Sequence, residues 1–193
     1  CSIHALELNE KELDESITLV PVGDYRNCLA MRDAVYRMTR AHGLITGEGE
    51  VELSIRWDDS ETGVPCKARW DRHSPSIAGG AIVDLKTTRD ANPRVFERAI
   101  FQYGYHRQGA FYLRSAKAHG LPHRHYVIIA IEKEPPYGVC VYRLTEGAID
   151  AGDYQLEPLL RRYAECLEAD VWPCYPDEVQ DISLPYWAWG QIE

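Results

Sequence analysis

The sequence predicts an α/β fold in which helices flank a mixed central β-sheet. Two observations support this class: five segments carry the residue patterns of strands, and three longer segments carry helical periodicity. The expected strands are residues 50–57, 66–71, 81–88, 126–132 and 138–144, and the expected helices are residues 25–42, 90–120 and 153–169. The order is therefore helix, three strands, helix, two strands, helix, which is typical of a layered α/β domain.

The N-terminal elements read as one helix followed by a β-hairpin. The apolar stripe of the first helix consists of Leu29, Ala34, Val35 and Met38. Residues 50–57 alternate between apolar and polar side chains, as a strand with one buried face does. The turn-rich residues 58–65 then lead into strand 66–71, so we expect these two strands to pair.

The following segment, residues 90–120, predicts a long helix. Asp90 or Asn92 can cap it, and Pro93 suits its first turn. Gly104 interrupts the pattern, and we expect a kink there. We expect a single domain over residues 1–193, with a core of about residues 1–145, whereas residues 146–193 form a C-terminal helix and an aromatic, proline-rich tail.

The composition is that of a globular protein, with 45% hydrophobic and 26% charged residues. No apolar run approaches the roughly 18 residues that a membrane helix needs, so we expect no membrane association. The six cysteines are scattered without a C-x-x-C pair, which favours reduced thiols and a cytoplasmic location over a zinc or iron–sulfur site. The chain begins at Cys1 rather than Met, and we expect a fragment or a trimmed chain.

The net charge of −9 argues against a simple basic DNA-binding module, but the charge is uneven. Residues 94–125 contain six Lys/Arg and one Glu, whereas residues 145–193 contain two Arg and eleven acidic residues. A local basic groove can hold phosphates on an acidic protein. Basic side chains of the first segment, among them Arg107 and Arg114, are thus either phosphate contacts or an ordinary solvated helix face.

The strand AIVDLKTT, residues 81–88, carries two charges in an apolar run. Because side chains alternate across a strand, Asp84 and Lys86 point to the same face. Burying an unpaired charge costs several kcal/mol. These two residues therefore form an internal salt bridge, the wet face of an edge strand, or part of a functional site.

Two further acidic residues can converge on Asp84. Asp71 ends the second strand, and Glu52 lies on the polar face of the first. Converging carboxylates repel one another, and a divalent cation such as Mg²⁺, which prefers oxygen ligands, relieves that repulsion. Lys86 could then orient or help deprotonate a metal-activated water.

These residues match a known motif. Asp71 together with Asp84-Leu85-Lys86 resembles the signature of the PD-(D/E)XK nuclease superfamily, and QGAFY supplies a Q-x-x-x-Y, as in RecB-like nucleases. The longer block from VELSIRW to QGAFY is similar to the RecE-type exonuclease (exodeoxyribonuclease VIII) family. The N-terminal stretch SIHALELNEKELDESITLVP resembles that family's opening helix with its histidine, here His4. In all, the resemblance spans about residues 1–145.

The resemblance implies a PD-(D/E)XK core and a Mg²⁺-dependent exonuclease that degrades linear double-stranded DNA from the 5′ end, in phage-type recombination. We expect Mn²⁺ to support activity as well. The implied metal ligands are His4, Asp71, Asp84 and the Leu85 carbonyl. The implied catalytic residues are Asp71, Asp84, Lys86 and, as an additional acid, Glu52. The residues expected to bind nucleic acid are Gln108 and Tyr112, joined by Tyr105 on the same helix face, and by Arg107 and Arg114.

Related enzymes form rings around DNA. The resemblance therefore also implies a homo-oligomer, with double-stranded DNA as a partner and a single-strand annealing recombination protein as a candidate partner. A structure-specific or restriction-type endonuclease of the same fold and a non-catalytic DNA-binding subunit remain alternatives. The intact Asp84, Lys86 and Gln108 argue against the non-catalytic alternative.

Overall fold

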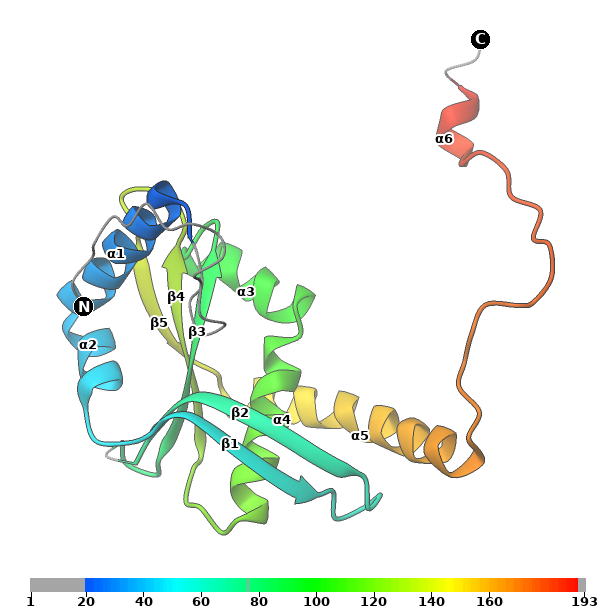
Figure 1. The fold of residues 1–193 in the computed structure, drawn as a ribbon, viewed down its shortest axis with the longest axis horizontal. Helices are drawn as coiled ribbons and strands as arrows, with labels where there is room; N and C mark the ends of the chain where they lie inside the picture. The colour runs from blue at the N-terminus through cyan, green and yellow to red at the C-terminus, as the bar shows by residue number, and fades with distance from the viewer. Residues whose placement is uncertain (1–19, 76, 191–193) are drawn as a thin grey trace, which may run out of the picture.

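The computed structural model describes residues 20–75 and 77–190 of the chain. Its centre is a five-stranded sheet in the order β1-β2-β3-β4-β5 (Figure 1). The strands are β1 (Val51–Asp58), β2 (Pro65–Ser74), β3 (Ala81–Thr88), β4 (His125–Glu132) and β5 (Val139–Arg143). β3 and β4 are parallel and the other neighbours are antiparallel, so the predicted mixed sheet is confirmed.

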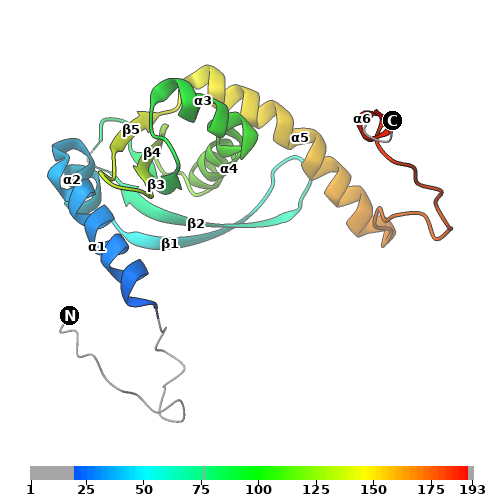
Figure 2. The same cartoon turned by 90° about the horizontal axis from the view of Figure 1, so that it is seen from above.

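Helices cover both faces of the sheet. On one face, α1 (Val22–Arg37) and α2 (Thr39–Thr46) pack against the side chains of Val83 and Ile129. On the other face, α3 (Pro93–Gln102) and α4 (Tyr105–Ala118) cover Ile82 and Ile128, and Figure 2 shows both layers. Because side chains alternate along β3, Asp84 lies on the same face as Ile82 and points toward α4.

Two of the predicted helices are each divided in two. The first is interrupted at Met38, which is extended with φ −83° and ψ 103° and separates α1 from α2. The second is interrupted at Gly104, whose φ of 69° lies in the left-handed region that glycine tolerates, so the kink expected there is confirmed. Asn92 is the residue that caps α3, because its side chain accepts a hydrogen bond from the Arg94 amide.

The C-terminal helix α5 (Glu146–Ala169) begins earlier than the predicted residue 153. The Thr145 hydroxyl caps it by accepting a hydrogen bond from the Ala148 amide, and Pro158 lies inside the helix without ending it. The later turns of α5 project from the body, and an extended segment follows that ends in the short helix α6 (Tyr186–Trp189) (Figures 1 and 2). None of the helices within residues 20–75 and 77–190 has both the length and the apolarity to cross a membrane.

Candidate active site

The candidate site lies where β2 and β3 separate. Their ladder consists of the pairs Arg72–Val83, His73–Ile82 and Ser74–Ala81. Beyond it, the Leu85 amide donates a hydrogen bond to Asp71 Oδ2 at 2.8 Å in place of a backbone partner. The amide and carbonyl of one strand residue point toward the same neighbour. The Leu85 carbonyl therefore also faces the gap that Asp71 spans.

The alternation of side chains along β2 is interrupted around Asp71. Trp70 belongs to the core beneath α4, and the His73 ring lies 6.2 Å from the Trp70 ring, although strict alternation would place them on opposite faces. Arg72 instead donates to the Leu44 carbonyl at the end of α2, at 2.8 Å. Local irregularities of this kind re-aim side chains next to active sites. Here the irregularity accompanies the turn of the Asp71 carboxylate toward β3.

Asp84 is the buried anion of the site, with 1% of its surface exposed. The Lys86 ammonium lies 2.6 Å from Asp84 Oδ2, and the Gln108 side-chain amide donates to Oδ1 at 3.1 Å. Burial raises the pKa of the Asp84 carboxyl, Lys86 opposes that rise, and the neighbouring Asp71 carboxylate adds to it. The pKa of Asp84 is raised overall, because loss of hydration outweighs the attraction of one lysine. An internal ion pair is thus present, and the alternative that this face of the strand is exposed to solvent is wrong.

Helix α4 supplies the second wall of the site. Gln108 Nε2 also donates to the Tyr112 hydroxyl at 3.2 Å, so one amide group joins Tyr112 to Asp84. Tyr105, in the first turn of α4, places its ring centroid 5.0 Å from Lys86 Nζ in a cation–π contact. The three α4 residues singled out by spacing therefore gather around the Asp84–Lys86 pair.

Tyr126 of β4 is a neighbour of this centre that the sequence did not reveal. Its hydroxyl is fully buried beside the Asp84 carboxylate. Burial, followed by the charge of Asp84, raises the pKa of the phenol, so the hydroxyl stays protonated. Gly109 makes room for the ring, because a Cβ at that position would lie 2.7 Å from Tyr126 Cδ1. In the sequence, Tyr126 shows only the pattern of a buried strand.

The donor set at the gap fits a hard divalent cation. Asp71 and Asp84 supply carboxylate oxygens, the Leu85 carbonyl faces the same gap, and Asp84 is a buried anion with a single lysine for compensation. Mg²⁺ is typically held by one or two carboxylates and keeps several waters. Within the described part of the chain, no three His, Cys, Asp or Glu side chains gather closely enough to hold a metal ion. A protein cage of three such ligands is therefore not formed by these residues.

One of the expected catalytic acids, Glu52, has other surroundings. Glu52 has a left-handed backbone, with φ 57°, and its half-exposed carboxylate pairs with Arg69. Within the described residues, Glu52 therefore does not join Asp71 and Asp84 in a cluster of three carboxylates that could hold a metal ion. His4 lies outside the described residues.

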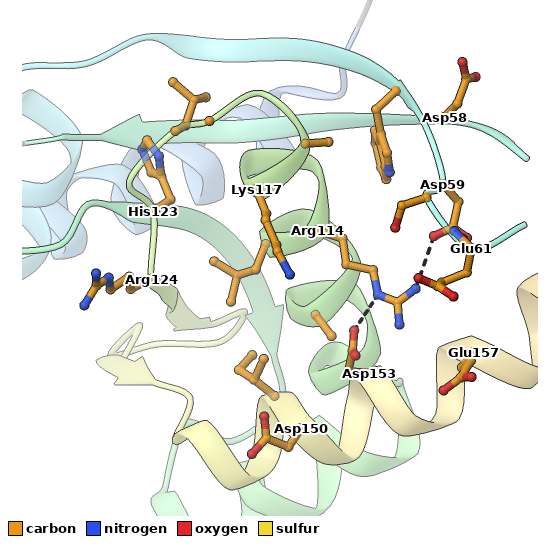
Figure 3. A pocket seen from close by; sticks show the side chains of 18 of the residues that line it. Asp58, Asp59, Glu61, Arg114, Lys117, His123, Arg124, Asp150, Asp153 and Glu157 are labelled. Carbon is orange, nitrogen blue, oxygen red and sulfur yellow. Dashed lines mark hydrogen bonds and ion pairs between the residues drawn. The ribbon is translucent and has the colours of Figure 1, made fainter. Parts of the chain in front are cut away.

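The two arginines expected to contact phosphates have different surroundings. Arg107 is half-buried and its guanidinium lies against Gly104, where a Cβ would be 2.6 Å from Arg107 Nη2. Arg114 instead borders a cavity of about 1130 Å³ between α4, α5 and the β1–β2 turn, which none of the residues around Asp84 lines. There it lies between Asp59, at 3.2 Å, and Asp153 (Figure 3). The charge of Arg114 is therefore neutralised within the protein.

A known protein family matches most of the chain. The family model described as "PDDEXK-like domain of unknown function (DUF3799)" matches residues 10–185. No curated protein sequence matches the chain.

Among solved structures, the chain is similar to one named "Putative exonuclease", from Eubacterium rectale. The TM-score is 0.64 at 15% identity, and the alignment covers 86% of this chain and 65% of that one. An alignment with the structure of SSO0001 has a TM-score of 0.40 at 16% identity, over 75% of this chain and 61% of that one. The first similarity shows a shared fold, and the chain spans only 65% of the length of that structure's chain.

Proposed function

We propose that this chain, which belongs to the family of PDDEXK-like domains of unknown function, is a metal-dependent deoxyribonuclease. The observation that carries the proposal is the Asp84 centre, a buried carboxylate that holds Lys86 and Gln108 beside the gap spanned by Asp71. A buried ion pair is a poor way to stabilise a fold, because desolvation offsets most of its attraction. A carboxyl with a raised pKa at such a gap is instead typical of a functional site.

Each residue of the centre has a definable role in phosphodiester hydrolysis. Asp71, Asp84 and the Leu85 carbonyl would hold Mg²⁺ or Mn²⁺, which when bound supplies Lewis-acid stabilisation of charge on the phosphate. Lys86, paired with Asp84 Oδ2, would donate hydrogen bonds to the attacking water and to a phosphate oxygen, and its charge opposes the negative charge that develops there. Gln108 fixes the Asp84 carboxylate through Oδ1.

The proposed substrate is linear double-stranded DNA, degraded from the 5′ end. Three points support it: the Q-x-x-x-Y on α4 as part of the site, the basic segment 94–125 on and after the same helices, and the resemblance to RecE-type exonucleases. The name "Putative exonuclease" of the similar structure supports the choice of exonuclease activity. Arg114 is not one of the proposed DNA contacts, because Asp59 and Asp153 already neutralise it.

The test uses three duplexes of the same sequence: linear and labelled at the 5′ ends, linear and labelled at the 3′ ends, and covalently closed. With Mg²⁺ or Mn²⁺, we expect the 5′ label to appear first as mononucleotide or short product, and the closed circle to persist. EDTA should abolish digestion, and Asp84→Asn should do the same. Efficient cutting of the closed circle would refute the exonuclease proposal and favour an endonuclease of this fold. Full activity in EDTA would refute the metal-dependent chemistry.

A further inference from the structure

The last described part of the chain, residues 171–190, is here called the C-terminal arm. It carries nine large apolar side chains, all exposed: Val171, Trp172, Tyr175, Val179, Ile182, Leu184, Tyr186, Trp187 and Trp189. Tyr175, Val179, Ile182 and Tyr186 have 94–96% of their surface exposed. Isolated apolar residues on a surface are ordinary, but a dense series of this kind marks an interaction site.

The arm leaves the body in a direction that favours contact with another molecule. It begins after the projecting end of α5, and Pro173 and Pro176 stiffen its first residues (Figures 1 and 2). The extended part of the arm, residues 171–185, can reach about 50 Å, whereas a body of about 150 residues has a radius of gyration of about 15 Å. The arm is therefore long enough to cross the face of a second molecule.

A surface beside the candidate active site has the complementary chemistry. This α3 surface is a pocket of about 670 Å³ between α3, the end of β3 and the end of β4. Its charged rim contains Arg89, Arg98 and Lys133, with Asp90 as the acidic exception. Val95 and Tyr103 line it as well and are exposed apolar side chains. A surface that binds only phosphate groups needs these cations but does not need exposed apolar side chains.

The arm matches this surface in charge and in apolar character. It contains three acidic residues, Asp177, Glu178 and Asp181, and no Lys or Arg. Proline-rich extended segments commonly bind grooves lined by aromatic residues, since their ordering costs little entropy. We propose that the C-terminal arm of one copy of this chain docks on the α3 surface of a second copy. If two copies exchange arms with each other, they form a closed dimer. If the arm of each copy docks on the next copy instead, the copies form a ring.

A charge-swap experiment on the full chain tests this pairing by sedimentation velocity. The arm variant is Asp177→Lys/Glu178→Lys/Asp181→Lys, and the surface variant is Arg89→Glu/Arg98→Glu/Lys133→Glu. We expect the unaltered chain to associate, each variant alone to associate at least about tenfold more weakly, and an equimolar mixture of the two to associate again. As a matched control, Glu165→Lys/Glu168→Lys on exposed turns of α5 should leave association unchanged.

Several outcomes would overturn the proposal. One is an unaltered chain that sediments as a monomer at all concentrations, because the arm would then have no second copy as its partner. Another is a mixture of the two variants that stays dissociated, since the arm and the α3 surface would not be partners. The third is a surface variant that binds duplex DNA less well yet associates normally, which would assign the α3 surface to nucleic acid.

Discussion

Replacement of Lys86 by Met should destabilise the metal-free protein by an amount that depends on pH. The substitution leaves Asp84, which is 1% exposed, without its cation. Removing one partner of a buried ion pair costs about 3–5 kcal/mol, unless the remaining group becomes neutral. The carboxyl can do so by taking up a proton, and from an unfolded-state pKa of about 3.9 this costs about 4 kcal/mol at pH 7 and about 1.5 kcal/mol at pH 5.

The direction in which the stability of the Lys86→Met variant changes with pH follows from proton linkage. The pKa of Asp84 is raised in the folded protein, and loss of Lys86 raises it further, so the folded variant binds more protons than its unfolded chain. The variant should therefore gain stability relative to the wild type as pH falls from 7 to 5. The double variant Asp84→Asn/Lys86→Met carries no buried charge here and should lose this pH dependence.

The measurement is urea unfolding in EDTA at pH 5 and pH 7, followed by tryptophan fluorescence, to which the buried Trp70 contributes. Lys67→Met, at an exposed position of β2, is the matched control and should change the free energy of unfolding little at either pH. A loss of equal size at both pH values, or a double variant as unstable as the single one, would show that Asp84 is not the uncompensated charge.

Three further predictions concern the surroundings of the site. Gly109→Ala should cost about 1–3 kcal/mol of stability, because its Cβ would lie 2.7 Å from Tyr126, whereas Gly147→Ala has open space and should be near neutral in the same urea assay. Arg114→Gln should cost about 1–3 kcal/mol, since it leaves the buried Asp59 with less compensation, yet leave affinity for duplex DNA unchanged in a binding titration. Mg²⁺ at about 100 times its dissociation constant should stabilise the wild type by about 2.7 kcal/mol, and a melting temperature indifferent to Mg²⁺ and Mn²⁺ would count against the metal site.

The central part of the site could be predicted from the sequence because it depends on short-range rules. The predicted strand 81–88 coincides with β3, and the period of two places Asp84 and Lys86 on one face, where they pair at 2.6 Å. The helical spacing of Gln108 and Tyr112 likewise predicts that they are neighbours, as their hydrogen bond shows.

Features that depend on tertiary packing or on local backbone irregularity could not be predicted in this way. Tyr126 reaches Asp84 because β4 pairs in parallel with β3 in one register, which no residue pattern specifies. Glu52 pairs with Arg69 on a backbone of positive φ, a conformation that most residues avoid. The break at Met38 has neither glycine nor proline to mark it, and α5 begins at Glu146, before the predicted residue 153.

The central claim, that Asp84 and Lys86 form a nuclease centre, is tested most directly by single-turnover cleavage of end-labelled linear duplex DNA with Mg²⁺. Wild type, Lys86→Met and the exposed control Lys67→Met are compared at a temperature where circular dichroism shows all three folded. We predict that Lys86→Met lowers the cleavage rate at least about a hundredfold, as expected for loss of a group that stabilises developing charge, and that Lys67→Met cleaves like the wild type. Cleavage by folded Lys86→Met at the wild-type rate would contradict the claim.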